Sequence, residues 1–319
     1  MALPPKNHSD RLGKKEKSWP DFALWSQSLW KGSEEKAPSK PLDPALYMVA
    51  TPIGNLGDIT LRALWVLKNA DLLLCEDTRV TGSMLSRYGI SKPLISCHDH
   101  NETGRISEVL ARISSGGAIA FVSDAGTPLV SDPGFRLVRA CRDNNLPVFA
   151  IPGASACLTA LACAGLPADR FFFHGFLPTK KGARQDILRE LAGLKATLLF
   201  YETAPRLADT LNDMLAVFSG SRRACVAREL TKLFEDVVCE PLDALCALAS
   251  QDCFAKGELV VLVEPASENP STDEDLDTTL VKALQTMSVK DAAAFVAKAL
   301  NLKKSTVYQR ALTLSGTKK

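Results

Sequence analysis

The sequence predicts two consecutive α/β domains followed by a basic helical tail. Short apolar runs alternate with amphipathic stretches of helical length through residues 46–264, which is the pattern of βαβ units. Glycine-bearing loops follow three of the apolar runs, and such loops bind ligands at the ends of parallel strands. The 319 residues are enough for two domains with complete cores and some appendages.

The first domain is expected over residues 46–167. Its strand-like runs and helical patterns alternate, which predicts a doubly wound sheet. The strands are expected at 46–50, 72–75, 118–122 and 147–151, and the helices at 60–70, 104–115, 134–144 and 154–164.

A second α/β domain is expected over residues 168–264. The same alternation of strand and helix patterns predicts it. The strands are expected at 171–176, 197–201, 224–228 and 259–263, and the helices at 183–193, 206–218 and 242–250.

Two segments outside the domains differ from them in composition. Residues 1–45 are rich in Lys, Pro, Ser and Glu, so we expect a disordered extension with one short helical stripe at 22–30. Residues 265–278 carry two prolines and a run of acids, which is typical of a linker.

The tail, residues 279–319, has helical patterns at 289–300 and 305–314 around a short turn. This arrangement predicts a helix-turn-helix in which Ser305 is the N-cap of the last helix.

Charge is unevenly distributed along the chain. The net charge is +2, but residues 1–40 carry +3, residues 279–319 carry +7 and the part between them carries −8. Two basic ends on an acidic body indicate a polyanionic partner that is held from the periphery. No apolar run is long enough to span a bilayer, and the N-terminus lacks the apolar core of a secretory signal. We therefore expect a cytoplasmic protein with no membrane partner.

The cysteines and histidines do not predict a metal site. None of the nine cysteines forms a CxxC pair, and most lie in apolar segments, which favours reduced core thiols over a disulfide or zinc framework. The segment from Cys97 to His100 places two histidines at i, i+2, but further ligands at suitable spacing are missing. A structural or RNA-contacting role is favoured there. The core thiols are expected to include Cys75, Cys141, Cys157, Cys163 and Cys225.

Three loops that follow strand-like runs contain the residues best suited to bind a ligand. VSDAGTPLVSDPG at 122–134, TPIGNLGD at 51–58 and PGASA at 152–156 each follow an apolar run. Glycines let a backbone approach a ligand closely, and carboxylates accept hydroxyl or ammonium groups. Because the carboxyl ends of parallel strands meet at one edge, we expect a shared pocket for a nucleoside-like ligand. The alternative is that Asp124 and Asp132 only cap turns.

The common nucleotide and hydrolase fingerprints are absent. The sequence contains no GxGxxG and no GxxxxGK[ST], which disfavours hydride transfer on a nicotinamide cofactor and P-loop phosphoryl transfer. It also contains no GxSxG elbow and no HExxH.

Collinear segments carry a family resemblance. They are TPIGNLGDIT (51–60), CEDTR (75–79), VSDAGTPLVSDPG (122–134), IPGASA (151–156), FHGFLP (173–178), YETAPR (201–206), ARELTK (227–232) and KGELVVLVE (256–264). Together these segments resemble the ribosomal RNA small-subunit methyltransferase I family of the tetrapyrrole methylase superfamily. The resemblance continues more weakly through the tail and leaves residues 1–45 outside.

The resemblance implies two α/β domains of tetrapyrrole-methylase type, with S-adenosylmethionine bound in a cleft between them, and usually a homodimer. It also implies methyl transfer to the ribose 2′-oxygen of a cytidine in the decoding region of 16S ribosomal RNA. The 16S RNA or the 30S subunit is then the expected partner. The expected cofactor-binding residues are Pro52, Gly54, Asn55, Gly57, Asp124, Ala125, Gly126, Thr127, Pro152, Gly153, Ser155 and Ala156.

A ribose hydroxyl is a weak acid, so a nearby base or cation should help it to lose its proton. The charged residues of the matching segments are therefore the catalytic candidates, although for each one an inter-strand salt bridge or a helix cap is the alternative. The candidates are Glu76, Asp77, Arg79, Glu202, Arg206, Arg228, Glu229, Lys232 and Glu235.

The chain departs from the family pattern at two places. The family typically has a Pro-His pair where this chain has Ala204-Pro205, and a histidine where this chain has Phe234. Neither histidine can therefore be an essential base here.

Basic residues at the start of the second domain's first helix and in the tail are candidates for phosphate contacts. The alternative is that they form solvated surfaces. The candidates are Lys180, Lys181, Arg184, Lys303, Lys304 and Arg310.

Two rival functions remain open. One is a superfamily enzyme that methylates carbon of a tetrapyrrole precursor, but a basic helix-turn-helix has no use in porphyrin binding. The other is a non-enzymatic nucleic-acid-binding regulator, which would lack the charged residues that surround the expected cofactor site.

Overall fold

The computed structural model describes residues 42–251, 254, 256–266, 273–300 and 304–316. The chain divides into two compact units, one running to Thr159 and including Glu229–Glu235, and the other made of Ala160–Arg228 and Asp236–Lys319. The predicted N-terminal extension up to residue 41 and its short helix lie outside the described residues. The second unit begins several residues before the boundary expected at 167.

The first unit is built on a parallel sheet of five strands in the order β3-β2-β4-β1-β5. The central strands are continuous apolar runs that are buried on both faces, as is usual for parallel strands between helices. The strands are β1 Ala45–Val49, β2 Leu72–Cys75, β3 Leu94–Ser96, β4 Ala118–Val122 and β5 Val148–Ile151.

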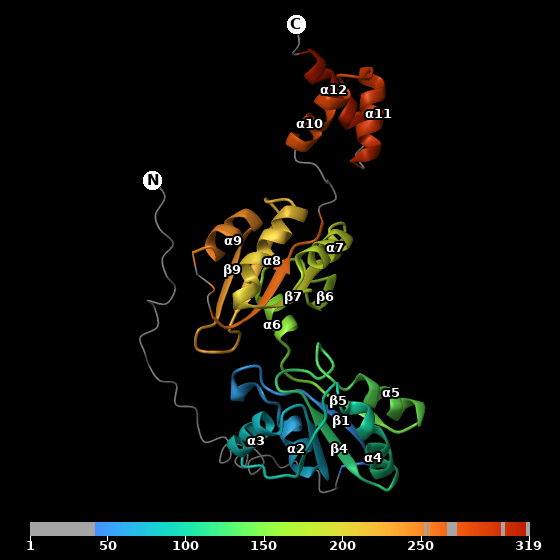
Figure 1. Cartoon of the computed structure of the whole chain (residues 1–319), viewed down its shortest axis with the longest axis vertical. Coiled ribbons are helices and arrows are strands. Elements are labelled where there is room, and N and C mark those ends of the chain that lie inside the picture. Colours follow the sequence, from blue (N-terminus) through green and yellow to red (C-terminus); the bar gives the residue numbers. More distant parts are fainter. Residues whose placement is uncertain (1–41, 252–253, 255, 267–272, 301–303, 317–319) are drawn as a thin grey trace, which may run out of the picture. The chain divides into compact units, whose positions relative to one another are not determined.

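Helices cover both faces of this sheet (Figure 1). Helices α2 and α3 share a hydrophobic core with one face, and α4 and α5 share another core with the opposite face. The predicted doubly wound sheet is therefore confirmed. The helices are α2 Leu61–Asn69, α3 Thr78–Arg87, α4 Glu102–Ser114, α5 Phe135–Asp143 and α6 Ala156–Cys163, and a short 3-10 turn spans Leu56–Asp58.

The second unit contains a mixed sheet in the order β6-β7-β10-β8-β9. Strand β6 is parallel to β7, whereas β10 is antiparallel to both β7 and β8. The strands are β6 Phe171–Phe176, β7 Thr197–Thr203, β8 Arg223–Arg228, β9 Asp236–Pro241 and β10 Glu258–Val263. Helices α7 Lys181–Leu191, α8 Ala204–Val217 and α9 Leu242–Ala249 pack into one core with this sheet.

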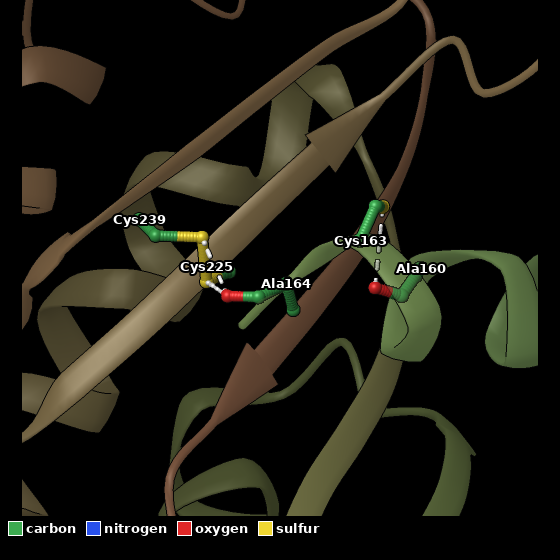
Figure 2. The surroundings of a disulfide bond; sticks show 5 residues. All are labelled: Ala160, Cys163, Ala164, Cys225 and Cys239. Carbon is green, nitrogen blue, oxygen red and sulfur yellow. Dashed lines mark hydrogen bonds between the residues drawn. A yellow bond between two sulfur atoms is a disulfide. The ribbon is translucent and has the colours of Figure 1, made fainter. Parts of the chain in front are cut away.

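A disulfide bond links β8 to β9 and corrects the expectation for Cys225. The antiparallel register places Cys225 directly opposite Cys239, with a Cα–Cα distance of 4.0 Å. Both sulfur atoms lie 3.2 Å from the carbonyl oxygen of Ala164 (Figure 2). Strand β9 is missing from the sequence-based expectation, so the facing partner of Cys225 was not visible.

Most of the other cysteines keep the predicted reduced state. Cys75, Cys141 and Cys157 are free and buried, and burial raises the pKa of the first two thiols to about 11. Cys163 is free but exposed, so its assignment to the core is wrong. Its thiol donates to the carbonyl oxygen of Ala160 at 3.3 Å (Figure 2).

Three helices form the tail, α10 Asp273–Ala283, α11 Val289–Ala299 and α12 Lys304–Gly316. They have their own hydrophobic core, which includes Leu280, Val296 and Val307. Helix α10 begins inside the segment expected to be a linker up to 278. Ser305 lies within α12, which begins at Lys304. The prediction that Ser305 is the N-cap of this helix is therefore wrong.

Within the described part of the chain, no helix is long and apolar enough to cross a membrane.

Candidate functional site

The loops that follow β1 and β4 are joined by backbone hydrogen bonds. The N–H of Thr51 donates to the carbonyl oxygen of Gly126 at 2.9 Å, and the N–H of Gly126 donates back to Thr51 at 3.1 Å. The hydroxyl of Thr51 also donates to the carbonyl oxygen of Ser123 at 3.4 Å. These contacts hold the two loops together at the carboxyl edge of the parallel sheet.

The loop after β5 joins the same group. The hydroxyl of Thr127 donates to the carbonyl oxygen of Ala154 at 3.0 Å, and that of Thr60 donates to the carbonyl oxygen of Pro152 at 3.5 Å. The predicted convergence of the three glycine-bearing loops is therefore confirmed. The exposed residues of these loops include Gly54, Gly57, Ala125, Pro152 and Gly153.

The glycines in these loops are required by contacts within the protein. A Cβ on Gly153 would lie 2.9 Å from the Cβ of Ala50, and one on Gly126, where φ is +81°, would lie 3.3 Å from Ile53 Cγ2. A Cβ on Gly54 would lie 2.4 Å from Lys232 Cγ. The absence of side chains therefore allows the loops to pack closely against each other and against residues 229–235.

Residues 229–235 form a tight turn, here called the 229–235 turn, which packs with the first unit. The Lys232 ammonium lies 2.8 Å from Glu229 Oε1, and the N–H of Thr231 donates to Glu235 Oε2 at 2.6 Å. Both Glu229 and Thr231 have positive φ, +50° and +66°, a conformation that costs energy outside glycine. Three catalytic candidates thus stabilise the turn itself.

Carboxylates gather at the ends of β2 and β4. The Asp124 carboxylate accepts the N–H of Asp77 at 3.0 Å. Burial raises the pKa of Glu76, and the negative charge of Asp124 adds to this effect. The pKa of Asp132 is raised to about 6, mainly by burial. A hydrogen bond from Ser123 lowers this pKa, whereas the negative charges of Glu76 and Asp124 raise it. Asp132 thus belongs to the carboxylate group, although it is not among the site residues expected from the sequence.

Asp77 and Arg79 form an ion pair and hydrogen bonds with each other. Asp77 is the N-cap of α3 and accepts the N–H of Arg79 at 2.8 Å. The Arg79 guanidinium lies 2.6 Å from the same carboxylate and lowers the pKa of Asp77 to about 2. This geometry matches the helix-cap alternative that the sequence left open.

Three catalytic candidates belong to the second unit. Glu202 is buried and accepts hydrogen bonds from the N–H of Thr203 and the hydroxyl of Thr210, at 2.8 and 2.7 Å. Arg206 lies 3.4 Å from Glu202 and donates to the carbonyl oxygen of Leu177 at 2.7 Å. Arg228 lies 4.0 Å from Asp236. The contacts of Glu202 are those of a structural carboxylate.

Some of the residues expected to contact phosphate are exposed, whereas others are already paired with an acidic side chain. Lys180, Lys181 and Lys304 are exposed. Arg184 is buried and ion-paired with Asp213 at 2.6 Å, so its assignment to phosphate binding is wrong, because its charge is not accessible.

In the tail, Arg310 pairs with Asp277 through two hydrogen bonds, one of 2.7 Å from Nε. Lys303 lies outside the described residues. Among the described residues, no cluster of three or more histidine, cysteine or acidic side chains could hold a metal ion.

The family profile of tetrapyrrole (corrin/porphyrin) methylases matches residues 45–246 of this chain. The profile of the RsmI C-terminal HTH domain matches residues 270–315, which include α10 to α12. Together the two matches cover the first sheet, the second sheet except β10, and nearly all of the tail.

Solved structures show the same fold at low identity. The methyltransferase CobJ has 19% identity and a TM-score of 0.53, and covers 70% of this chain and 94% of its own. Uroporphyrin-III C-methyltransferase from Thermus thermophilus, complexed with S-adenyl homocysteine, has 18% identity and a TM-score of 0.50, and covers 69% of this chain and 97% of its own.

Curated relatives are much more similar in sequence. Ribosomal RNA small subunit methyltransferase I of Mesorhizobium japonicum is 45% identical over 89% of this chain and 97% of its own length. The protein of that name from Vibrio cholerae is 46% identical over 83% of this chain and 93% of its own. The one from Escherichia coli O157:H7 is 45% identical over 85% and 96%. The chain therefore belongs to the tetrapyrrole methylase family and, within it, to the ribosomal RNA small subunit methyltransferase I proteins.

Proposed function

We propose that this chain transfers the methyl group of S-adenosylmethionine to the ribose 2′-oxygen of a cytidine in the decoding region of 16S ribosomal RNA. The observation that carries the proposal is the similarity to the Mesorhizobium japonicum relative over 89% of the chain. The tail itself matches the RsmI C-terminal HTH profile over residues 270–315. A tetrapyrrole methylase has no evident need for such a tail, which supports RNA over a porphyrin as substrate.

The converging loops of the first unit are suited to the cofactor. Ala125 and Gly153 present an exposed surface with little bulk, which suits close packing of a nucleoside. The Asp124 carboxylate is fixed by the N–H of Asp77 and can accept a hydrogen bond from a ribose hydroxyl or an ammonium group. When bound, S-adenosylmethionine supplies an electrophilic methyl group on sulfur.

The carboxylates beside these loops are suited to accept the proton of the ribose hydroxyl. A partly buried carboxyl with a raised pKa is a stronger base than an exposed one. Asp132, with a pKa of about 6, is still mostly ionised at neutral pH. We assign proton acceptance to this group, with Glu76 and Asp132 as its members. The loops would contribute mainly by holding the reacting oxygen in line with the methyl carbon.

The expected homodimer remains part of the proposal. Phe149 on the edge strand β5 and Leu158 on α6 are 45% and 52% exposed, and exposed apolar side chains support a subunit interface. Light scattering of the purified protein tests this point. A cytoplasmic location also stays a prediction.

One experiment tests the function. The purified full chain is incubated with methyl-labelled S-adenosylmethionine and 30S subunits, naked 16S RNA or a tetrapyrrole precursor. Because a 2′-O-methyl group removes the nucleophile of alkaline cleavage, we expect the label in an alkali-resistant dinucleotide. Label in single nucleotides would mean base methylation, and label only in the tetrapyrrole would restore the rival enzyme. Both results contradict the proposal.

A further inference from the structure

Two consecutive apolar side chains stand out at the tip of the 229–235 turn. Leu233 is 86% exposed and Phe234 is 68% exposed. These are the highest exposures of large apolar side chains in the described part of the chain. Leaving a Leu-Phe pair in water forgoes hydrophobic stabilisation of about 1.5–3 kcal/mol for each side chain. Such a pair, side by side on one turn, indicates a surface that is covered during function.

The turn that carries Phe234 is well fixed. Besides the ion pair of Lys232 with Glu229 at 2.8 Å, the N–H of Lys232 donates to the carbonyl oxygen of Glu229 at 3.0 Å and that of Glu235 donates to Lys232 at 3.3 Å. Because these contacts lie on both sides of positions 233 and 234, the aromatic ring projects from a folded base. Little conformational entropy is then lost when a partner covers it.

The turn lies against the first of the three strand-end loops. The Lys232 side chain covers Gly54, and the hydroxyl of Thr231 lies 3.1 Å from the place of a Cβ on that glycine. The negative charge of Glu235 adds to the effect of burial in raising the pKa of Asp58. The turn that carries Phe234 therefore lies against the 51–58 loop, one of those proposed to hold the methyl donor.

The charges around Phe234 disfavour a phosphate contact. The turn carries Glu229 and Glu235 against a single cation, Lys232, and that cation is already paired. RNA can approach such a surface with a base face, which is apolar and stacks on aromatic rings. Enzymes that modify a nucleotide expose it from its neighbours and frequently stack bases on aromatic side chains.

We propose that Phe234, supported by Leu233, is a stacking surface for a nucleobase of the RNA substrate at or beside the nucleotide that receives the methyl group. The proposal rests on the proposed function, since it takes RNA as the substrate. Phe234 is a positioning residue: it fixes the nucleotide and takes no part in proton transfer.

The variants Phe234→Ala, Phe234→Leu and Phe234→Trp separate ring stacking from general hydrophobicity. Leucine keeps an apolar side chain of similar size without a planar ring, whereas tryptophan enlarges the ring. Stacking of one base corresponds to about a 5- to 150-fold change in affinity. We expect kcat/KM for 30S subunits to fall by that factor in the Ala and Leu variants and to be preserved in the Trp variant. The affinity for S-adenosylmethionine, measured by calorimetry, should be unchanged in all three.

Phe171→Ala is the matched control, because Phe171 is another exposed aromatic, at 45%, but lies on β6 of the second unit. It should keep wild-type kcat/KM. The Trp variant adds a direct reading, since its fluorescence should be quenched by a single-stranded oligonucleotide of the substrate sequence. The same titration of the wild type gives the fluorescence change of the four native tryptophans, which is subtracted.

Three outcomes overturn the proposal. Wild-type kcat/KM in Phe234→Leu, together with unquenched fluorescence in Phe234→Trp, removes stacking while leaving the proposed function intact. A dimer that dissociates in Phe234→Ala by light scattering assigns the ring to a second copy of the chain. A wild-type protein that binds S-adenosylmethionine but methylates no ribosomal RNA overturns both this proposal and the proposed function.

Discussion

Lys232 lies across the backbone of Gly54, so that a Cβ at position 54 would sit only 2.4 Å from Lys232 Cγ. This contact joins the TPIGNLGD loop to a turn that is about 180 residues away in the sequence. The contacted atom is near the start of the lysine side chain, so the side chain cannot simply swing its end away. The strand-end loop and the turn are thus coupled through one glycine.

Gly54→Ala should therefore displace the 229–235 turn. The new Cβ meets Lys232, and φ at this position is +151°, which side chains rarely adopt. Overpacking of this kind costs about 1–3 kcal/mol of stability, measured by urea denaturation, and we expect methylation to fall as well. Adding Lys232→Ala should recover part of the stability, which a double-mutant cycle will detect.

The control for this substitution is Gly104→Ala in α4, where a Cβ meets nothing within 4 Å. Alanine at that helical position should be neutral or stabilising, by up to about 1 kcal/mol. If Gly54→Ala is as stable and active as Gly104→Ala, the coupling between loop and turn is not important.

Asp124 offers a test of the cofactor loop with two graded variants. Asp124→Asn keeps an oxygen that can accept the N–H of Asp77 but removes the charge. Asp124→Ala removes both. We expect calorimetry to show a large loss of S-adenosylmethionine affinity in both, because the charge is proposed to contact the cofactor. Full affinity in Asp124→Asn would mean that the residue serves only to hold the loop.

Asp132 should make stability depend on pH. Burial is the main reason why its pKa is raised from the ordinary value of 3.8 to about 6, so the folded state binds this proton more tightly than the unfolded state. The free energy of unfolding should therefore rise as pH falls from about 6 to about 4. The shift is equivalent to about 3 kcal/mol, but solvent screening of this partly exposed group reduces the expected effect to about 1 kcal/mol.

Asp132→Asn is the variant that isolates this contribution. It should be more stable than the wild type at pH 7, and the difference should disappear near pH 4. Urea denaturation of both proteins at several pH values measures it, since the other titrating groups are common to both. A difference that stays constant between pH 7 and pH 4 would contradict the raised pKa.

The disulfide between Cys225 and Cys239 should stabilise the second sheet. The two residues are separated by 14 positions, and closing a loop of that length contributes about 3 kcal/mol in the chain-entropy account. Reduction should lower the stability of the wild type by roughly this amount, whereas Cys239→Ser should have the lower stability with or without reductant. Mass spectrometry showing both Cys225 and Cys239 as free thiols in protein purified without reductant would contradict the bond.

The parts of the fold that the sequence predicts are those with a strong local pattern. Strands β2 and β4 are uninterrupted apolar runs, buried at every position, and a parallel strand between two helical layers requires that pattern. Helix α3 buries only Thr81 and Leu85, and every position of β9 is half-buried or exposed. Because α3 and β9 bury so little apolar surface, and because β3 is only three residues long, these three elements were missed.

The candidate site divides in the same way. Convergence of the loops follows from parallel strands, because their carboxyl ends share one edge. Packing of the 229–235 turn against Gly54 depends on a contact between residues far apart in sequence, which no local pattern encodes. The burial of Arg184 beside Asp213 depends on two helices meeting, and the sequence shows only a basic run.

The tail should supply the salt-dependent part of RNA binding. Residues 279–319 carry a net charge of +7, and helices α10 to α12 have a core of their own. A chain ending at Ala266 keeps the hydrogen bond from Ala266 to Leu194 at 3.1 Å, so the second sheet should stay intact and S-adenosylmethionine affinity should be unchanged. Without the tail fewer counterions are released, so the plot of log affinity against log salt should become flatter.

Two point variants distinguish direct contact from structural support in this tail. Lys304 is exposed at the start of α12, so Lys304→Ala should reduce the salt slope by about 1 if it contacts a phosphate. Arg310 is held by Asp277. The substitution Arg310→Ala should therefore lower the thermal stability of helices α10 to α12, and circular dichroism measures this change. Equal salt slopes for the full chain and the truncated chain would show that RNA binds elsewhere on the protein and that α10 to α12 have a structural role.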